Sequence, residues 1–181
     1  RANLQLRGVS PDHEMPLIAA LLEAGLGPTR PEADDIRNVM VSPTAGIDPA
    51  LVIDALPVAR DLLSRLQSED RYAALSPKFC VQADGGESGA VVDHPHDIWL
   101  ASMDGKAMAL GLAGSPPIDA DDTTPFVAVD HAHAGEVVAA AIDLFLEEAA
   151  RDAVVNTVSD DSPGIVYSHC LIQDPTCWVG K

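Results

Sequence analysis

A hairpin signal near the middle of the chain sets the first limit on its fold. The pair Asp104-Gly105 lies between two apolar segments, residues 97–103 and 106–112. Asp-Gly between two such segments is a strong short-range signal for a β-hairpin, because both residues tolerate tight turns. The sequence therefore predicts two adjacent antiparallel strands here, and any fold of the chain has to include them.

The first 70 residues carry strand, helix and strand signals in that order. Residues 3–9 alternate apolar and polar side chains, which predicts a half-buried strand. Ser10-Pro11 supplies an N-cap and a proline at the first helical position, so a helix is expected to begin there and to end at Gly25. Residues 36–41 predict a second strand. This order is typical of a βαβ unit.

The same kinds of signal continue through the rest of the chain. A second helix is expected from Asp48-Pro49, with a kink at Pro57, because a proline inside a helix removes one hydrogen bond and clashes with the preceding turn. The remaining predicted elements are strands at residues 78–83, 126–129 and 164–167 and an amphipathic helix at residues 135–150. Helices and strands mix along the chain, which predicts an α+β fold.

The charge balance excludes several classes of protein. The 181 residues include 28 acidic and 11 basic side chains, for a formal net charge of -17. Nucleic-acid binders need a basic surface that neutralises phosphates, so no nucleic-acid partner is expected. No apolar run approaches the roughly 18 residues of a membrane-spanning helix, so no membrane is expected either. The odd number of cysteines, three, fits poorly with a disulfide framework and favours a reducing cytoplasm.

The few basic residues are informative because of where they stand. Arg1, Arg37 and Lys78 lie beside or within predicted strands. Cations at strand ends of an acidic protein can bind a polyanion, Arg through its planar fork and Lys as a point charge. The alternative is that all three are ordinary surface charges whose aliphatic stems cover the core.

Four segments resemble, in order and spacing, the motifs of the nitrite and sulfite reductase haemoprotein superfamily. They are Arg1-Ala2-Asn3-Leu4-Gln5-Leu6-Arg7-Gly8-Val9, Arg37-Asn38-Val39 with Ser42-Pro43, Leu75-Ser76-Pro77-Lys78-Phe79, and the hairpin at residues 97–112. The resemblance covers roughly residues 1–113, and the helix at residues 135–150 also lies where the family has one.

The resemblance implies a ferredoxin-like βαβ half-domain joined to an α+β domain of the nitrite and sulfite reductase type. The expected division is a half-domain at residues 1–70, the reductase-type domain at residues 71–160 and an irregular tail at residues 161–181. In the family, two such halves pack around a sirohaem coupled to a [4Fe-4S] cluster, and basic residues face the tetrapyrrole carboxylates and the substrate anion. Carried over to this chain, the expected tetrapyrrole- or anion-binding residues are Arg1, Gln5, Arg7, Arg37, Asn38 and Lys78.

The sequence departs from the reductases at two points. The family has a second Lys where this chain has Cys80, so one cation is missing. The family cluster needs four cysteines, and three cannot supply them. The cluster would therefore be ligated by a C-terminal half absent from this chain or by a partner subunit, with a separate electron donor.

Residues 37–46 most resemble the precorrin-3B synthase branch of the superfamily. This implies a monooxygenase-type oxidoreductase of cobalamin biosynthesis that binds a polycarboxylate tetrapyrrole. One alternative is half of a sirohaem-dependent nitrite or sulfite reductase. Another is a non-catalytic module that binds a tetrapyrrole or docks a partner, and the last is an α+β domain with no tetrapyrrole.

Two histidine pairs and one cysteine are further candidates for a functional site. His94-Pro95-His96 and His131-Ala132-His133 each bring two imidazoles close together, but their spacing suggests solvated loops, and no metal site is expected. Cys80 is either a reactive thiol activated by Lys78 or a small core residue.

Overall fold

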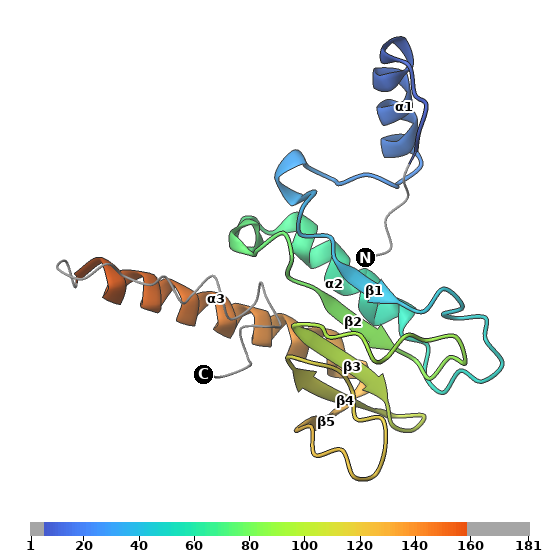
Figure 1. The fold of residues 1–181 in the computed structure, drawn as a ribbon, viewed down its shortest axis with the longest axis vertical. Helices are drawn as coiled ribbons and strands as arrows, with labels where there is room; N and C mark the ends of the chain where they lie inside the picture. The colour runs from blue at the N-terminus through green and yellow to red at the C-terminus, as the bar shows by residue number, and fades with distance from the viewer. Residues whose placement is uncertain (1–5, 159–181) are drawn as a thin grey trace.

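The computed structural model describes residues 6–158 and places one five-stranded mixed sheet at their centre (Figure 1). The strands are β1 (Val39–Val41), β2 (Val81–Asp84), β3 (Ile98–Ser102), β4 (Ala107–Leu112) and β5 (Val127–Asp130), in this order across the sheet. The first three strands are parallel, and β4 and β5 are antiparallel to their neighbours. The predicted α+β fold is confirmed.

Two helices pack on one face of this sheet, and a third stands apart from it (Figure 1). The packed helices are α2 (Leu56–Ser68) and α3 (Ala134–Val158), and the separate one is α1 (Pro11–Glu23), which has no buried residue. Short 3-10 helices η1 (Pro31–Ala33), η2 (Asp70–Ala74) and η3 (His131–His133) join these elements.

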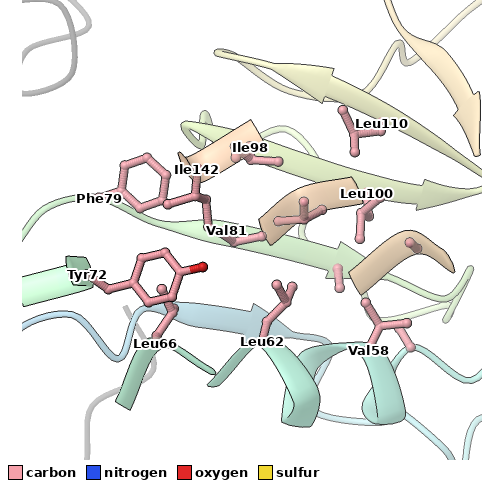
Figure 2. Close-up of a cluster of buried hydrophobic side chains, with 14 of the residues drawn as sticks. Val58, Leu62, Leu66, Tyr72, Phe79, Val81, Ile98, Leu100, Leu110 and Ile142 are labelled. Carbon is pink, nitrogen blue, oxygen red and sulfur yellow. The ribbon is translucent and has the colours of Figure 1, made fainter. Parts of the chain in front are cut away.

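The core lies between α2, α3 and the sheet, as Figure 2 shows. Alternation along each strand sends every second side chain to this side. In α2, Val58, Leu62 and Leu66 recur every fourth residue, so they share one helix face and point at the sheet. They meet alternate residues of β2 and β3 and, from α3, Ile142.

The predicted hairpin is confirmed as β3 and β4, with a four-residue connection instead of a two-residue turn. The carboxylate of Asp104 accepts hydrogen bonds from the backbone N–H groups of Lys106 and Ala107, both at 2.8 Å. This side chain closes the turn, which explains why the Asp-Gly pair marked the right place.

Three predicted elements differ from the structure. Residues 6–9 form no strand, and residues 1–5 and 164–167 lie outside the described part of the chain. The second helix, α2, begins at Leu56 and not at Asp48, so Pro57 stands in its first turn, where the missing N–H costs no hydrogen bond, and causes no kink. β2 begins at Val81 and not at Lys78, because residues 76–79 form a turn in which the Phe79 N–H donates to the Ser76 carbonyl at 2.9 Å.

The division into domains at residues 70 and 160 stays a prediction. In the described residues, the core contains Ile36 and Leu62 from one side of position 70 and Val81 and Ile98 from the other. Within residues 6–158, no helix is both long and apolar enough to cross a membrane.

Candidate functional site

The parallel strands bring three chain segments to one edge of the sheet. Arg37-Asn38 precedes β1, Lys78-Phe79-Cys80 precedes β2, and His96-Asp97 precedes β3. Because β1, β2 and β3 are parallel, their N-terminal ends lie side by side. Backbone hydrogen bonds continue between the segments: Val81 N–H donates to the Asn38 carbonyl at 2.9 Å, and Ile98 N–H to the Cys80 carbonyl at 3.3 Å.

Asn38 links the first two segments through its side chain. Its Nδ2 lies 2.8 Å from the carbonyl oxygen of Pro77 and 3.1 Å from that of Phe79, the residues on either side of Lys78. A third carbonyl, of Asp35, lies 3.2 Å away. The side-chain amide of Asn38 therefore donates to backbone carbonyls of the same chain.

The two cations at this edge differ in their surroundings. The side chain of Arg37 is 24% exposed, and its Nη1 lies 3.5 Å from Asp34 Oδ1 while its Nη2 donates to the Leu26 carbonyl at 3.3 Å. Its buried Nε has no hydrogen-bond partner among the described residues. Lys78 is exposed and makes no ion pair within that part of the chain. Within the described residues, the charge of Lys78 is therefore not paired with a carboxylate, and that of Arg37 is paired with Asp34 only at 3.5 Å.

Cys80 and Asp97 form a half-buried polar pair at the same edge of the sheet. Asp97 Oδ2 accepts the backbone N–H of Cys80 at 2.8 Å. Burial raises the pKa of the Cys80 thiol, and the nearby Asp97 charge acts in the same direction. Burial likewise raises the pKa of Asp97. The pKa of the Cys80 thiol is thus shifted in the direction opposite to activation, which favours the second alternative, a small partly buried residue, over a thiol activated by Lys78.

His96 adds a buried imidazole beside this pair. It is 4% exposed, neither ring nitrogen has a hydrogen-bond partner among the described residues, and burial lowers its pKa. Neither Asp97 nor His96 was predicted to lie at this edge. The available signal was their position directly before β3, equivalent to that of Cys80 before β2.

Of the six predicted site residues, the structure brings together Arg37, Asn38 and Lys78. Arg1 and Gln5 lie outside the described residues. Arg7 is exposed in the segment that precedes α1, which is not one of the three segments at the edge. The binding role of all six stays a prediction.

The described residues do not fit an iron–sulfur cluster or a metal site. No group of three or more His, Cys, Asp or Glu side chains in that part of the chain is placed to hold a metal ion. The rings of His94 and His96 lie 5.1 Å apart, and His131 Nε2 lies 3.2 Å from the Asp54 carbonyl. With three cysteines in the whole sequence, four thiolate ligands are not available.

A known protein family matches the part of the chain that contains this edge of the sheet. Residues 32–155 match the model of the nitrite and sulphite reductase 4Fe-4S domain. The chain belongs to this family. The family match includes the Arg37 and Lys78 segments, the whole sheet, α2 and most of α3. α1 lies outside it.

Individual family members support the same assignment. A precorrin-3B synthase from Sinorhizobium sp is 33% identical over 118 residues, which is 64% of this chain and 25% of the relative. A ferredoxin–nitrite reductase from Synechococcus elongatus is 28% identical over 102 residues, covering 54% of this chain and 20% of the relative. An assimilatory ferredoxin-dependent nitrite reductase from Haloferax mediterranei is 28% identical over 130 residues, covering 66% and 22%.

The aligned segments span a quarter or less of the length of these curated relatives. The relatives are named as oxidoreductases, which places this chain in an oxidoreductase family. No solved structure matches the chain.

Proposed function

We propose that this chain is part of a precorrin-3B synthase-like oxidoreductase and that it binds a polycarboxylate tetrapyrrole. The observation that carries the proposal is the meeting of Arg37 and Lys78, 41 positions apart, at one edge of a parallel sheet. On a chain with a formal net charge of -17, two cationic residues at one edge of the sheet form a local exception that suits a polyanion. The similarity to a precorrin-3B synthase supports the choice within the family.

The ligand is expected to be large and multiply charged. Lys78 is exposed and ends in a flexible ammonium group, whereas the Arg37 guanidinium is three-quarters buried and held by weak contacts. Carboxylates on the rim of a macrocycle are far enough apart to reach both. Cys80 supplies no third cation, which favours an organic polycarboxylate over a small inorganic anion.

The proposed role of each residue is binding and orientation. Arg37 would pair with one carboxylate through its fork, and Lys78 would attract a second as a point charge. The family name implies a [4Fe-4S] cluster, which supplies electrons where it is present, but the described residues do not fit one. The proposal therefore includes thiolate ligands and an electron donor from elsewhere, in a longer chain or a partner, and a cytoplasmic location.

A second candidate is part of a sirohaem-dependent nitrite reductase. The relatives named as nitrite reductases favour it, and the same two cations would then bind the carboxylates of the sirohaem cofactor. Cys80 argues against it, because a half-buried thiol beside a carboxyl group supplies no positive charge to hold nitrite or sulfite.

Binding of uroporphyrin, a macrocycle with eight carboxylates, tests the shared chemistry of both candidates. Arg37→Gln and Lys78→Gln should each weaken binding about 10-fold to 100-fold, the effect of losing one hydrogen bond to a charged group, about 1.5–3 kcal/mol. The control is Lys106→Gln, which removes an equally exposed cation from the β3–β4 connection at the opposite edge of the sheet. Equal affinities of all four proteins for uroporphyrin would disprove the proposed site.

Iron and acid-labile sulfide measured on the full-length protein then separate an oxidoreductase from a binding module. An oxidoreductase of this family should contain both, and their absence would leave only tetrapyrrole binding. If iron and acid-labile sulfide are both absent while uroporphyrin still binds, the proposed oxidoreductase function is rejected and the proposed binding site is retained.

A further inference from the structure

We infer that Asn38 is a positioning residue that holds Lys78 for ligand binding and does not contact the ligand itself. This inference rests on the proposed function, since Lys78 is the group that Asn38 would position. It also revises the expectation that Asn38 takes part in binding directly. Three observations carry it: the hydrogen bonds of the Asn38 amide, the fixed turn around Lys78, and the link to Arg37.

The donor capacity of the Asn38 side chain is fully used within the protein. An amide NH₂ group has two hydrogens. Its two shortest contacts, 2.8 Å to the Pro77 carbonyl and 3.1 Å to the Phe79 carbonyl, take both, and the Asp35 carbonyl at 3.2 Å competes for them. No hydrogen remains for an anion. A ligand could accept a hydrogen bond from this amide only if one of its hydrogen bonds to the Pro77 or Phe79 carbonyl were broken.

The two carbonyls held by Asn38 lie directly before and after Lys78. The same turn is tied at its start, because the Lys78 N–H donates to Ser76 Oγ at 3.2 Å and the Phe79 N–H to the Ser76 carbonyl at 2.9 Å. It is anchored at its end, because the Phe79 ring is 5% exposed and stacks on Phe145 at 5.8 Å. Lys78 is therefore the exposed tip of a fixed turn, and its backbone position is set although its ammonium group moves freely.

Asn38 also connects this turn to the other cation. It follows Arg37 in the sequence, and its own carbonyl accepts the Val81 N–H at 2.9 Å. The β1–β2 pairing begins only at Val39 and Val81, so Arg37 and Lys78 both stand beyond the regular ladder. The backbone and side chain of Asn38 together tie the backbone of Arg37 to the turn that carries Lys78.

A fixed turn affects affinity because a mobile cation loses freedom when a ligand orders it. The cost of ordering a loop and its side chain is subtracted from the binding energy, and a preorganised group avoids much of it. Loss of the Asn38 bonds should therefore weaken binding through Lys78 alone. The effect should vanish once the Lys78 charge has been removed.

A double-mutant cycle with uroporphyrin tests this dependence. The main variant is Asn38→Leu, which has a similar shape, no charge and no donor. We expect it to weaken binding about fivefold to 10-fold in the natural sequence and less than twofold in the Lys78→Gln background. Asn38→Ser, whose hydroxyl can donate to one of the carbonyls, should recover part of the loss and serves as the second variant if Asn38→Leu folds poorly.

A matched control removes side-chain hydrogen bonds elsewhere. Thr44→Val deletes the two bonds of Thr44 Oγ1, 3.2 Å to Asp48 and 3.1 Å to Ser42 Oγ, in the loop after β1, at the opposite edge of the sheet. It should leave uroporphyrin affinity unchanged. A purely structural loss of stability would lower affinity in both variants to a similar extent.

Amide hydrogen exchange of the ligand-free chain provides a readout that does not depend on binding. In Asn38→Leu, exchange at residues 78–81 should accelerate at least about tenfold, while residues 108–110 in β4 should be unaffected. Equal loss of affinity in both Lys78 backgrounds, or unchanged exchange at residues 78–81, would overturn the inference. If Lys78→Gln itself has no effect on uroporphyrin binding, the proposed function fails, and the exchange result alone then decides whether Asn38 holds this turn.

Discussion

Trp99 of β3 lies against the backbone of Gly111 of β4, its register partner in the antiparallel pair. A Cβ atom added at Gly111 would lie 2.0 Å from Cζ2 of the indole, which is far inside van der Waals contact. The indole is fully buried on the sheet face opposite α2 and α3 and also meets the ring of Phe126, at 6.4 Å between centroids. Gly111 is therefore required by the space that Trp99 occupies.

Gly111→Ala should lower the free energy of unfolding by about 2–3 kcal/mol, because the methyl group forces the indole or the strand to move. The measurement is urea unfolding of the purified chain. Gly105→Ala is the control, since a Cβ atom there meets nothing within 4 Å. An unchanged urea midpoint for Gly111→Ala would show that Trp99 is not packed on this strand.

Asp84→Asn should stabilise the chain near neutral pH and have less effect in acid. Burial raises the pKa of Asp84 to about 6, and its hydrogen bond to the carboxyl group of Glu87, which is itself buried, acts in the same direction. The folded state thus binds a proton that the unfolded state releases near pH 4, so this group's contribution to stability falls as the pH rises from about 4 to 6. Asn can donate permanently to Glu87 and still accept the Gly86 N–H, now 3.1 Å from Asp84 Oδ1.

Urea unfolding of both proteins between pH 4 and pH 7.5 measures this difference. The gain from Asp84→Asn should grow with pH to about 2 kcal/mol. Asp104→Asn is a control of opposite sign, because hydrogen bonds from Lys106 and Ala107 lower the pKa of Asp104. Its substitution should destabilise the chain at neutral pH and matter less in acid. A pH-independent effect of Asp84→Asn would contradict the raised pKa.

Leu62→Ala should be strongly destabilising because Leu62 is 1% exposed at the centre of the α2 face that meets the sheet (Figure 2). Truncation of a buried leucine leaves a cavity and costs about 2–5 kcal/mol. The neighbouring Leu63 is only half-buried, so Leu63→Ala should cost clearly less in the same thermal or urea unfolding experiment. Equal losses for both variants would mean that α2 packs with a different face.

Cys80 should react slowly with iodoacetamide in the folded protein. The thiolate is the reactive form, and burial raises the pKa of this thiol. At pH 7.5 we expect alkylation of the Cys80 peptide, followed by mass spectrometry, to be at least about tenfold slower than in urea-unfolded protein. Asp97→Asn removes the neighbouring negative charge and should accelerate alkylation of Cys80. An alkylation rate in the folded protein equal to that in the unfolded protein would refute the raised pKa of this thiol.

Features that depend on residues close in the sequence were predicted well. The cap and proline at Ser10-Pro11 marked α1, the pair Asp104-Gly105 marked the β3–β4 hairpin, and the periodic apolar residues of 135–150 marked α3. Each signal acts through neighbours within a few positions. Pro57 was misjudged for a related reason, because a proline looks the same in the sequence whether a helix continues through it or begins at it.

The sequence by itself determined the α+β class, the acidic net charge, the shortage of cysteines for a four-thiolate cluster and the four chain segments that resemble the family motifs. Only the tertiary structure decided that Arg37 and Lys78 share an edge, that Cys80 lies half-buried against Asp97, and that the side chain of Asn38 turns inward to bond the backbone around Lys78. These relationships depend on which strands pair and in which direction. Such pairing is settled by burial of side chains distant in the sequence, which no local pattern records.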